Sequence, residues 1–350
     1  MKLLIYSFSE LKEVEGVGNV ALNISKFLLF DQTFLSLGKH QKVLFYSFLS
    51  LFYFAFKVFK TKPDVVLVHS VEASFDPVVA RKLFGFKYKI VSIAHGTYFG
   101  LLKEYEKEIA FGNAKPKLTF ILNLKISIFR GRFVKYCDAV TAVSSVAKSD
   151  VKLFYGVDSI VIPNGVEDEF FKMRSNKTKV NMGRILFVGN HFWLKGLHYL
   201  IKANSILLNP KKIVAVGIDE GQIKELRGLV DCKEVEFKKL LSRKDLIKEY
   251  VKGGIFAMPS VYESFGIVYL EAMCLGMPVI ASKGTGVEDF IIEGKNGFLV
   301  EKRNPKSIAE AIIKAEKLCG KVPKPESKYL WKNISKQYAK VMQDVLKGKV

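Results

Sequence analysis

Short apolar runs alternate with longer amphipathic stretches along the first half of this 350-residue chain. Continuous runs rich in β-branched residues predict strands that are buried on both faces, and apolar positions every three or four residues predict the helices between them. The expected strands are 2–7, 63–69, 89–95, 138–144 and 159–163. This alternation is typical of a parallel sheet covered by helices on both faces.

The same alternation begins again in the second half. Strands are expected at 184–189, 212–217, 235–237, 254–258, 278–281 and 297–300, and helices at 197–208, 220–230 and 268–275. The pattern therefore predicts an α/β protein with two tandem Rossmann-like domains. Ligands of such a protein are expected at the carboxyl ends of the strands, in a cleft between the domains.

Four segments follow from this pattern: an N-terminal domain (1–166), a polar linker without periodicity (167–182), a C-terminal domain (183–325) and a terminal helix (326–350). Apolar residues recur every three or four positions in the last segment, at Leu330, Ile334, Tyr338, Val341 and Val345. A helix with one apolar stripe is expected to pack back on the body of the protein.

Cysteine spacing and the N-terminus bear on the compartment. The four cysteines (Cys137, Cys232, Cys274 and Cys319) lie far apart and form no C-x-x-C, which favours reduced thiols in the cytoplasm over a disulfide framework or a structural zinc site. The chain begins Met-Lys-Leu-Leu-Ile-Tyr and becomes polar at Ser7, so the apolar run is too short for a signal peptide.

The longest uncharged run, 43–56, falls short of the roughly 20 residues that span a bilayer. It predicts a buried helix. Its high aromatic content leaves open a helix that dips into a membrane surface.

The formal net charge of +21 is spread over both halves of the chain. Acidic residues are absent between Glu108 and Asp138, where basic residues are interleaved with phenylalanines. We expect this window to form an acceptor-binding or membrane-facing surface through Lys115, Lys117, Lys125, Arg130 and Arg132. The alternative is an ordinary solvated surface.

The segment from Pro259 to Ser282 carries the most chemical information. A strand is expected to end at Pro259, a loop to carry Glu263, and a helix to begin near Gly266. The free amides and the positive dipole end of such a helix form an anion site. Glu271 is expected about two turns into the helix, so two carboxylates lie near this site and can accept hydrogen bonds from hydroxyl groups.

The pattern E-S-F-G-I-x-x-x-E-A-x-x-x-G-x-P-V-I-A, with Glu263 and Glu271, resembles the E-x7-E signature of the retaining GT-B glycosyltransferases of family 4. Other signals of that family occur in the same order, so the resemblance covers nearly the whole chain. They are the glycine loop (Gly16, Gly18), His95-Gly96, T-A-V-S (Ser144), I-P-N-G-V (Asn164, Gly165), V-G-x-x-x-x-L-K-G (Gly189, Lys195, Gly196) and G-T-G-V-E-D (Gly284 to Asp289).

The resemblance implies a role for each matching residue. Catalytic roles fall on Glu263, which faces the donor sugar, on Lys195, which neutralises the donor diphosphate, and on His95, which lies close to the transferred sugar. Glu271 binds the nucleotide ribose. The remaining donor-binding positions are Gly16, Gly18, Asn190, Ser264, Phe265, Gly266 and Ile267.

One position departs from the family pattern. Asn190 follows Gly189 where the family usually has an arginine. One of two cations expected on the diphosphate is therefore lost, and Arg184 or a protonated His191 is the expected compensation.

No D-x-D or H-E-x-x-H occurs, and we expect neither a metal nor another cofactor. His40, His69 and His198 are expected to be ordinary core or surface residues. The expected donor substrate is a nucleoside-diphosphate sugar. The acceptor is expected to be lipid-linked, a glycan or a small molecule, reached from the cytoplasm or from the cytoplasmic face of an anionic membrane.

Alternative functions stay open at this point. A nucleic-acid-binding protein is suggested by the charge alone, and the chain has no RNP box or helix-turn-helix signal to support it, so no nucleic-acid partner is expected. A sugar-nucleotide epimerase or a phosphorylase would need other catalytic groups. A glycosidase that uses Glu263 and Glu271 is disfavoured by the neighbouring anion site. Retention of configuration, implied by the resemblance, favours front-face displacement, because no enzyme nucleophile is evident.

Overall fold

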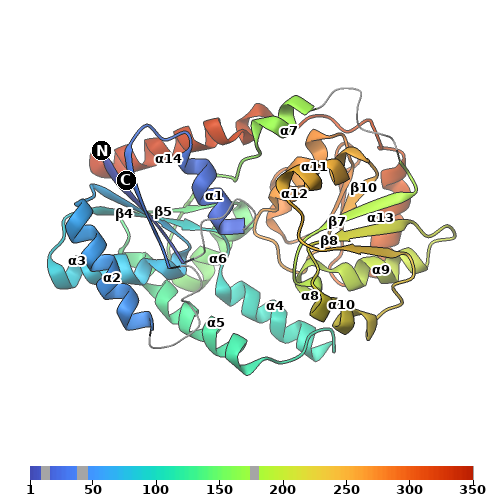
Figure 1. Cartoon of the computed structure of the whole chain (residues 1–350), viewed down its shortest axis with the longest axis horizontal. Coiled ribbons are helices and arrows are strands. Elements are labelled where there is room, and N and C mark those ends of the chain that lie inside the picture. The colour runs from blue at the N-terminus through green and yellow to red at the C-terminus, as the bar shows by residue number, and fades with distance from the viewer. Residues whose placement is uncertain (9–15, 38–45, 174–180, 350) are drawn as a thin grey trace. The chain divides into compact units, whose positions relative to one another are not determined.

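The computed structural model describes residues 1–8, 16–37, 46–173 and 181–349 (Figure 1). The chain divides into two compact units, and each is described by itself. Unit 1 takes its described residues from 1–102, 117–165 and 328–349, and unit 2 takes them from 103–116 and 166–327.

Unit 1 is built on a six-stranded parallel sheet in the order β2-β1-β3-β4-β5-β6. The strands are β1 (Lys2–Ser7), β2 (Asp31–Ser36), β3 (Val65–His69), β4 (Lys89–Ala94), β5 (Ala139–Ala142) and β6 (Ile160–Val161). Only β2 was not predicted, because its sequence, D-Q-T-F-L-S, is polar and its side chains are mostly accessible. The chain places β2 and β3 on opposite sides of β1, so the topological switch point lies between β1 and β3.

Helices cover both faces of this sheet. They are α1 (Gly16–Ser25), α2 (Tyr46–Thr61), α3 (Phe75–Phe84), α5 (Leu118–Gly131), α6 (Ser145–Tyr155) and α14 (Trp331–Leu346), with two short 3-10 turns, η2 (Val71–Ser74) and η3 (Arg132–Tyr136). In Figure 1, α1 and α14 lie on one side of the strands, and α2, α3 and α5 lie on the other. Tyr6 of β1 packs against Phe54 of α2 in the core, with 4.9 Å between ring centres.

The buried helix expected from the run 43–56 is buried on one face only. Residues 43–45 lie outside the described residues. In α2, Leu51, Phe54 and Val58 enter the core, whereas Phe52 and Phe56 are exposed. No helix in the described ranges has the length and the apolar character that crossing a membrane requires.

The terminal helix α14 packs back on unit 1, as its apolar stripe predicted. Ser335 Oγ donates a hydrogen bond to the carbonyl oxygen of Ile24 at the end of α1, at 3.0 Å. The ring of Trp331 lies so close to Gly165 that a Cβ atom there would approach it to 2.6 Å. The glycine of I-P-N-G-V is therefore needed for the close approach of this helix.

Unit 2 contains a second parallel sheet in the order β12-β11-β10-β7-β8-β9. Its strands are β7 (Arg184–Val188), β8 (Lys212–Val216), β9 (Val235–Lys238), β10 (Ile255–Ala257), β11 (Val279–Ser282) and β12 (Gly297–Val300). The chain runs from β7 through β8 to β9 and then places β10 on the other side of β7. The topological switch point therefore lies between β7 and β10.

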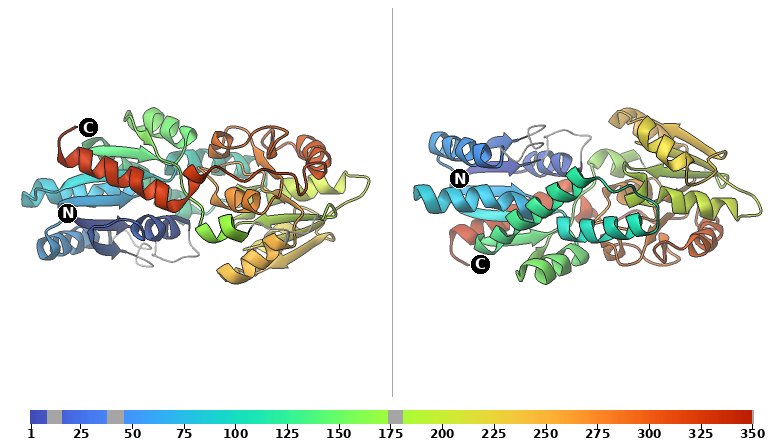
Figure 2. Two further views of the ribbon diagram at one scale, coloured as in Figure 1. Left: turned by 90° about the horizontal axis from the view of Figure 1, so that it is seen from above. Right: turned by 90° about the horizontal axis from the view of Figure 1, so that it is seen from below.

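The helices of unit 2 are α7 (Asp168–Met173), α8 (Phe192–Lys195), α9 (Leu197–Ser205), α10 (Glu220–Arg227), α11 (Arg243–Val251), α12 (Ile267–Cys274) and α13 (Pro305–Glu316). A 3-10 turn, η4 (Gly286–Asp289), follows β11, and another, η5 (Ser327–Tyr329), precedes α14. The views from above and from below in Figure 2 show helices on both faces of each sheet. Helix α4 (Tyr98–Ala110) crosses the division, because its residues from Lys103 onward group with unit 2.

Part of the segment expected to be a linker without periodicity (167–182) is helical in the structure. Residues 168–173 form α7, and Phe170 is fully buried in unit 2. Residues 174–180 lie outside the described residues. The chain passes from unit 1 to unit 2 between Gly165 and Val166, next to the expected boundary at 166.

Candidate functional site

Lys195 and Glu263 meet at the carboxyl edge of the unit 2 sheet. Lys195 is the last residue of α8, which follows β7, and Glu263 lies in the loop after β10. Lys195 Nζ donates to Glu263 Oε2 at 2.8 Å, and the two side chains are 18% and 11% exposed. Because β7 and β10 flank the topological switch point, the pair lies where open parallel sheets bind ligands.

Glycines fix the position of this lysine. Gly196 has a φ of 73°, and a Cβ atom there would lie 2.0 Å from the carbonyl oxygen of Pro259. At Gly189, a Cβ atom would come within 3.2 Å of Lys195 Cγ. The motif V-G-x-x-x-x-L-K-G is therefore a packing requirement that brings Lys195 to the sheet edge.

Helix α12 begins beside this pair. Its N-cap, Gly266, has a φ of 80°, and a Cβ atom there would overlap the Tyr269 ring at 2.5 Å. The first amides of a helix have no partner one turn earlier, so the start of α12 is a candidate anion site, although the amide of Tyr269 already donates to the carbonyl oxygen of Gly266 at 3.1 Å. Phe265 is buried against Phe290, whereas Ser264 and Ile267 keep some exposure.

Glu271 is the fifth residue of α12, so it lies little more than one turn into the helix, and the expectation of two turns was wrong. It is buried, and each of its two oxygens has one partner. Arg243 Nη1 lies 2.7 Å from Oε1, and Tyr250 Oη donates to Oε2 at 2.9 Å. Glu263 and Glu271 thus belong to one loop-helix segment but have different partners.

Arg243 is itself held on three sides. Besides Glu271, its guanidinium contacts Glu167 at 3.3 Å and lies over the Phe170 ring at 4.6 Å. Burial alone would lower the pKa of Arg243, but the charges of Glu271 and Glu167 outweigh this effect and raise it. The arginine is therefore a permanent cation that orients the second glutamate.

Two residues were expected to compensate for Asn190, and the expectation for Arg184 was wrong. Arg184 lies at the opposite end of β7 from Gly189, is buried, and donates to Glu249 at 2.8 Å and to the carbonyl oxygen of Gly253 at 2.7 Å. It therefore cannot reach a ligand at the carboxyl edge. His191 and Asn190 are both exposed just after β7.

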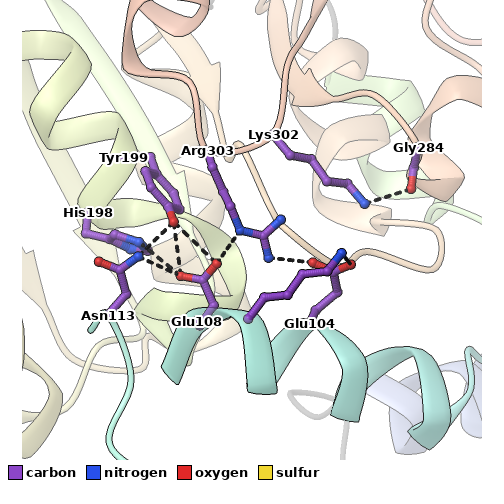
Figure 3. A network of polar contacts seen from close by, with 9 residues as sticks. Glu104, Glu108, Asn113, His198, Tyr199, Gly284, Lys302 and Arg303 are labelled. Carbon is purple, nitrogen blue, oxygen red and sulfur yellow. Dashed lines mark hydrogen bonds and ion pairs between the residues drawn. The ribbon is translucent and has the colours of Figure 1, made fainter. Parts of the chain in front are cut away.

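A second charged cluster in unit 2 joins the end of α4 to the loop after β12 (Figure 3). The carboxylate of Glu108 accepts hydrogen bonds from Arg303 Nε at 2.7 Å, from Asn113 Nδ2 at 3.0 Å and from Tyr199 Oη at 3.2 Å. His198, expected to be an ordinary residue, is buried with Nε2 3.4 Å from the same carboxylate. Arg303 also binds Glu104. Nearly every acceptor position of Glu108 is used within the protein.

Unit 1 carries most of the other residues that the sequence singled out, with Lys115 in unit 2. Gly16 and Gly18 lie in the first turn of α1, and the loop residues 13–15 before them lie outside the described residues. His95 follows β4, and its Nε2 lies 3.1 Å from Nδ1 of His69. Ser144 of T-A-V-S caps α6 by accepting a hydrogen bond from the amide of Ala147 at 3.0 Å.

The expected basic surface loses one member. Lys115, Lys117, Lys125 and Arg132 are exposed, but Arg130 is buried and was wrongly placed on the surface. Its Nη2 lies 2.7 Å from Oδ2 of the fully buried Asp76, and its guanidinium lies over the rings of Phe8 and Phe75. A buried carboxylate requires such a partner, and the sequence pattern around Arg130 did not reveal it.

Sequence reasoning missed Arg243, Tyr250 and the contact of His69. A signal existed for Arg243, because Ser242 and Asp245 form the S-x-x-D capping pattern that positions the start of α11. A signal also existed for His69, since its strand ends in histidine just as the neighbouring strand leads into His95. Within the described ranges, no three His, Cys, Asp or Glu side chains gather as a metal site would require.

Two family models match the chain. The model described as glycosyl transferases group 1 matches residues 167–328, and the model described as Glycosyltransferase Family 4 matches residues 33–170. Together they extend from the second strand of unit 1 to the end of unit 2.

Relatives of known sequence agree with these matches. The chain is 31% identical over 231 residues to an uncharacterized glycosyltransferase of Methanocaldococcus jannaschii, with 59% of each chain covered. It is 28% identical over 215 residues to a D-inositol 3-phosphate glycosyltransferase of Corynebacterium urealyticum, with 53% of this chain and 51% of the relative covered. The matches thus span little more than half the length of these two curated relatives.

Solved structures share the fold over the whole chain. HepE of Anabaena, in complex with UDP and glucose, superposes with a TM-score of 0.71 at 17% identity, covering 97% of this chain and 99% of that one. Sucrose-phosphate synthase of Thermosynechococcus elongatus superposes with a TM-score of 0.75 at 16% identity, covering 99% and 100%. At these identities the likeness shows the fold.

Proposed function

This chain belongs to the family 4 glycosyltransferases with the GT-B fold, and from that premise we propose that it transfers a hexose-type sugar from a nucleoside-diphosphate sugar to an acceptor, with retention of configuration. The observation that carries the proposal is the Lys195–Glu263 pair, at the switch point of the unit 2 sheet beside the start of α12. As part of the same proposal, the acceptor is lipid-linked, a glycan or a small molecule.

The chemistry follows from charge. A departing nucleoside diphosphate gains negative charge in the transition state, so a fixed ammonium group and helix-end amides stabilise it more than the ground state. Lys195 and the amides of Phe265, Gly266 and Ile267 are proposed to serve this purpose. Lys195 is held in place before the substrate arrives, because its packing against Gly189 and its hydrogen bond to Glu263 fix the ammonium group.

The two glutamates are proposed to accept hydrogen bonds from donor hydroxyls. Glu263 has one hydrogen-bond donor among the described side chains and retains lone pairs for sugar hydroxyls. Glu271 is proposed to bind the ribose through the lone pairs that Arg243 and Tyr250 leave. Ser264, Asn190 and, from unit 1, Gly16, Gly18 and His95 complete the proposed donor contacts.

We propose front-face displacement, in which the acceptor oxygen attacks the anomeric carbon on the face that the diphosphate leaves. The acceptor proton passes to the departing phosphate oxygen, so that the products are the glycoside and a protonated nucleoside diphosphate. The proposal requires no enzyme nucleophile. Trapping a covalent sugar–enzyme adduct with a slow donor analogue would contradict it.

The primary experiment is a thermal-shift screen with sugar nucleotides of different bases and sugars. A donor present at 100 times its Kd should stabilise the protein by about 2.7 kcal/mol. The donor found should then be turned over by the wild type and not by Lys195→Ala or Glu263→Ala. Full turnover by both variants, or no stabilisation by any nucleotide, would end the proposal.

The reaction is proposed to need no metal, because Lys195 and the amides supply positive charge where other enzymes place a cation. EDTA should leave turnover of the identified donor unchanged. Loss of turnover that Mg²⁺ or Mn²⁺ restores would contradict this part of the proposal.

Contact with an anionic membrane, at the cytoplasmic face, is proposed for the exposed face of α2. Hydrophobic side chains recur there every three or four residues, at Leu49, Phe52, Tyr53, Phe56 and Phe59. Lys57 and Lys60 lie on the same helix, which has no acidic residue. An apolar face bordered by lysines suits the interface of an anionic bilayer.

Helix α5 extends this face. Ser50 of α2 and Arg130 of α5 both reach the carboxylate of Asp76, so the two helices approach each other. Leu122 and Phe129 of α5 are exposed, as are Lys125 and Arg132. The basic window expected from the sequence thus contributes to the proposed surface without Arg130.

Co-sedimentation tests this contact. The wild type should bind vesicles with anionic lipids at low salt and not neutral ones, and Phe52→Ser with Phe56→Ser should abolish binding. Leu208→Ser in unit 2 also removes an exposed apolar side chain and should have no effect. Absence of binding to anionic vesicles would overturn the contact, as would self-association that the double variant removes without any lipid binding.

A further inference from the structure

Two histidines lie at the carboxyl edge of the unit 1 sheet, on neighbouring strands. His69 is the last residue of β3 and is fully buried, whereas His95 follows β4 and keeps part of its surface accessible. Strand β3 borders the topological switch point of this sheet, so both side chains lie at the edge where ligands are expected.

The two rings face each other edge to edge. Nδ1 of His69 and Nε2 of His95 are 3.1 Å apart, and the rings are nearly parallel, at 13°. Their centres are 5.3 Å apart, much farther than the facing nitrogens. Rings stacked face to face would not have this geometry, so the contact is a hydrogen bond in the ring planes.

The backbone around both histidines is fixed. Ser70 follows His69 with a φ of 97°, unusual for a residue other than glycine, and its amide donates to the carbonyl oxygen of Ile93 at 3.0 Å. Gly96 follows His95 with a φ of 120°. A strained position persists only where the surroundings impose it, so the two rings are held before any ligand binds.

A hydrogen bond between two imidazoles needs one N–H group and one lone pair. Burial lowers the pKa of both histidines, that of His95 to about 4. Each ring therefore carries a single proton at neutral pH, and two arrangements exist. Either His69 donates from Nδ1, or His95 donates from Nε2 and His69 carries its proton on Nε2.

The surroundings of His69 distinguish the two arrangements of protons. Its Nε2 is enclosed and has no hydrogen-bond partner in the described part of the chain. An enclosed N–H group without an acceptor is rarer than an enclosed acceptor without a donor. The proton of His69 is therefore better placed on Nδ1, where His95 accepts it.

We propose that His69 is a positioning residue that donates from Nδ1 to Nε2 of His95 and thereby keeps the proton of His95 on Nδ1, as a hydrogen-bond donor to a ligand oxygen. The ligand rests on the proposed function, in which His95 lies beside the donor sugar. In this arrangement His95 binds a sugar oxygen and does not act as a general base, because its basic nitrogen is occupied.

The tautomer of His95 can be observed without any substrate. In protein with ¹⁵N-labelled histidine side chains, two-bond nitrogen–proton correlations should show His95 protonated on Nδ1 and His69 protonated on Nδ1, with His95→Gln used for assignment. Protonation of His95 on Nε2 in the wild type would overturn the inference.

Substitutions at position 69 separate positioning from packing. The amide nitrogen of His69→Asn can donate from nearly the same place, so the His95 tautomer should persist, whereas His69→Leu should give a mixture of tautomers. With the identified donor, His69→Leu should lower kcat about tenfold, as expected for one lost hydrogen bond, with KM nearly unchanged. His69→Asn should restore most of kcat.

A matched control removes buried volume from the same strand. Val68→Ala, in the core beside His69, should lower the Tm and leave the His95 signals and kcat unchanged. An equal loss of kcat in Val68→Ala and His69→Leu would reduce His69 to a packing role and overturn the inference.

The predicted tautomer of His95 and the proposed glycosyltransferase function can be disproved independently of each other. If His95 carries its proton on Nδ1 but no sugar nucleotide binds, the positioning of His95 by His69 stands and the proposed function fails. If a donor is turned over while His95 carries its proton on Nε2, the proposed function stands and the inference fails.

Discussion

Two ion-paired clusters of unit 2 each pair a basic side chain with glutamate, and they are arranged differently. Lys195 and Glu263 make one hydrogen bond to each other and keep accessible surface at the sheet edge. Glu108 lies fully buried, and Arg303, Asn113 and Tyr199 all donate to it. A carboxylate whose lone pairs are used within the protein stabilises the fold, whereas one with lone pairs to spare is able to bind a ligand.

This difference between the two clusters also determines how much a substitution in each lowers stability. Removing one partner of a buried ion pair leaves an uncompensated charge, which lowers the free energy of unfolding. Removing Lys195 leaves Glu263, which keeps 11% of its side chain exposed and is solvated better than the fully buried Glu108. The two clusters should therefore respond oppositely in measurements of stability and of turnover.

The largest expected effect is on stability, from Arg303→Met. This change strips Glu104 and Glu108 of their shared cation and should lower the free energy of unfolding by about 3–5 kcal/mol. Urea denaturation measures it. Combining Arg303→Met with Glu108→Gln should recover part of the loss, because the buried charge is then absent. A double variant as unstable as the sum of the single ones would contradict the assignment.

The next effect is on turnover, from Lys195→Ala. Losing a preorganised cation should lower kcat for the identified donor by roughly 10²–10³-fold. The change in unfolding free energy should be smaller than for Arg303→Met, because Glu263 keeps some accessible surface and Glu108 keeps none. Lys211→Ala is the matched control, since Lys211 also pairs with a glutamate in unit 2 but precedes β8, at the opposite edge of the sheet. Equal losses of turnover in both variants would remove Lys195 from the proposed site.

A smaller effect is expected from Tyr250→Phe. The hydroxyl donates to Glu271 at 2.9 Å, and losing it leaves Arg243 as the remaining partner of that carboxylate among the groups described here. A hydrogen bond to a charged group contributes about 1.5–3 kcal/mol. The free energy of unfolding should decrease by an amount in that range. The Kd for the nucleotide should rise severalfold in calorimetric titration. An unchanged Kd would show that Glu271 does not depend on Tyr250 for nucleotide binding.

The smallest effect is a pH dependence at Glu104. Burial on its own would raise the pKa of this carboxyl, but hydrogen bonds from Arg303 and Lys107 outweigh burial and hold the pKa below its ordinary value. A group with a depressed pKa in the folded state contributes stability above its unfolded pKa and loses it as the pH falls through the folded value. Glu104→Gln should therefore be less stable than the wild type at pH 7, and the gap should close in acid. A gap that widens in acid would contradict this sign.

Much of the fold was predictable from the sequence because buried parallel strands leave an unambiguous pattern. Runs such as 63–69 and 184–189 have continuous apolar centres, at 65–68 and 185–188, and each contains a strand of the structure. Strand β2 was missed because an accessible edge strand needs no such run. Glu263 and Lys195 were predictable as neighbours of one site only through the family resemblance, since 68 residues separate them.

The errors have a common physical origin. Arg130 was expected on a basic surface and Arg184 beside the diphosphate, but each neutralises a distant buried carboxylate, Asp76 and Glu249. His69 was expected to be an ordinary residue because its position shows no metal-ligand spacing. Partners that the fold brings together from distant parts of the chain are not visible in local sequence.

The division of α4 has a practical consequence for anyone who dissects this protein. A fragment beginning at residue 166 would contain the whole of the second sheet but would lack the helical turns that carry Glu104 and Glu108. Arg303, Tyr199 and His198 would then face solvent or one another in a recombinant fragment. Supplying residues 103–116 as a fused or co-expressed peptide should improve the yield of soluble material, and the same peptide with both glutamates replaced by glutamine should not.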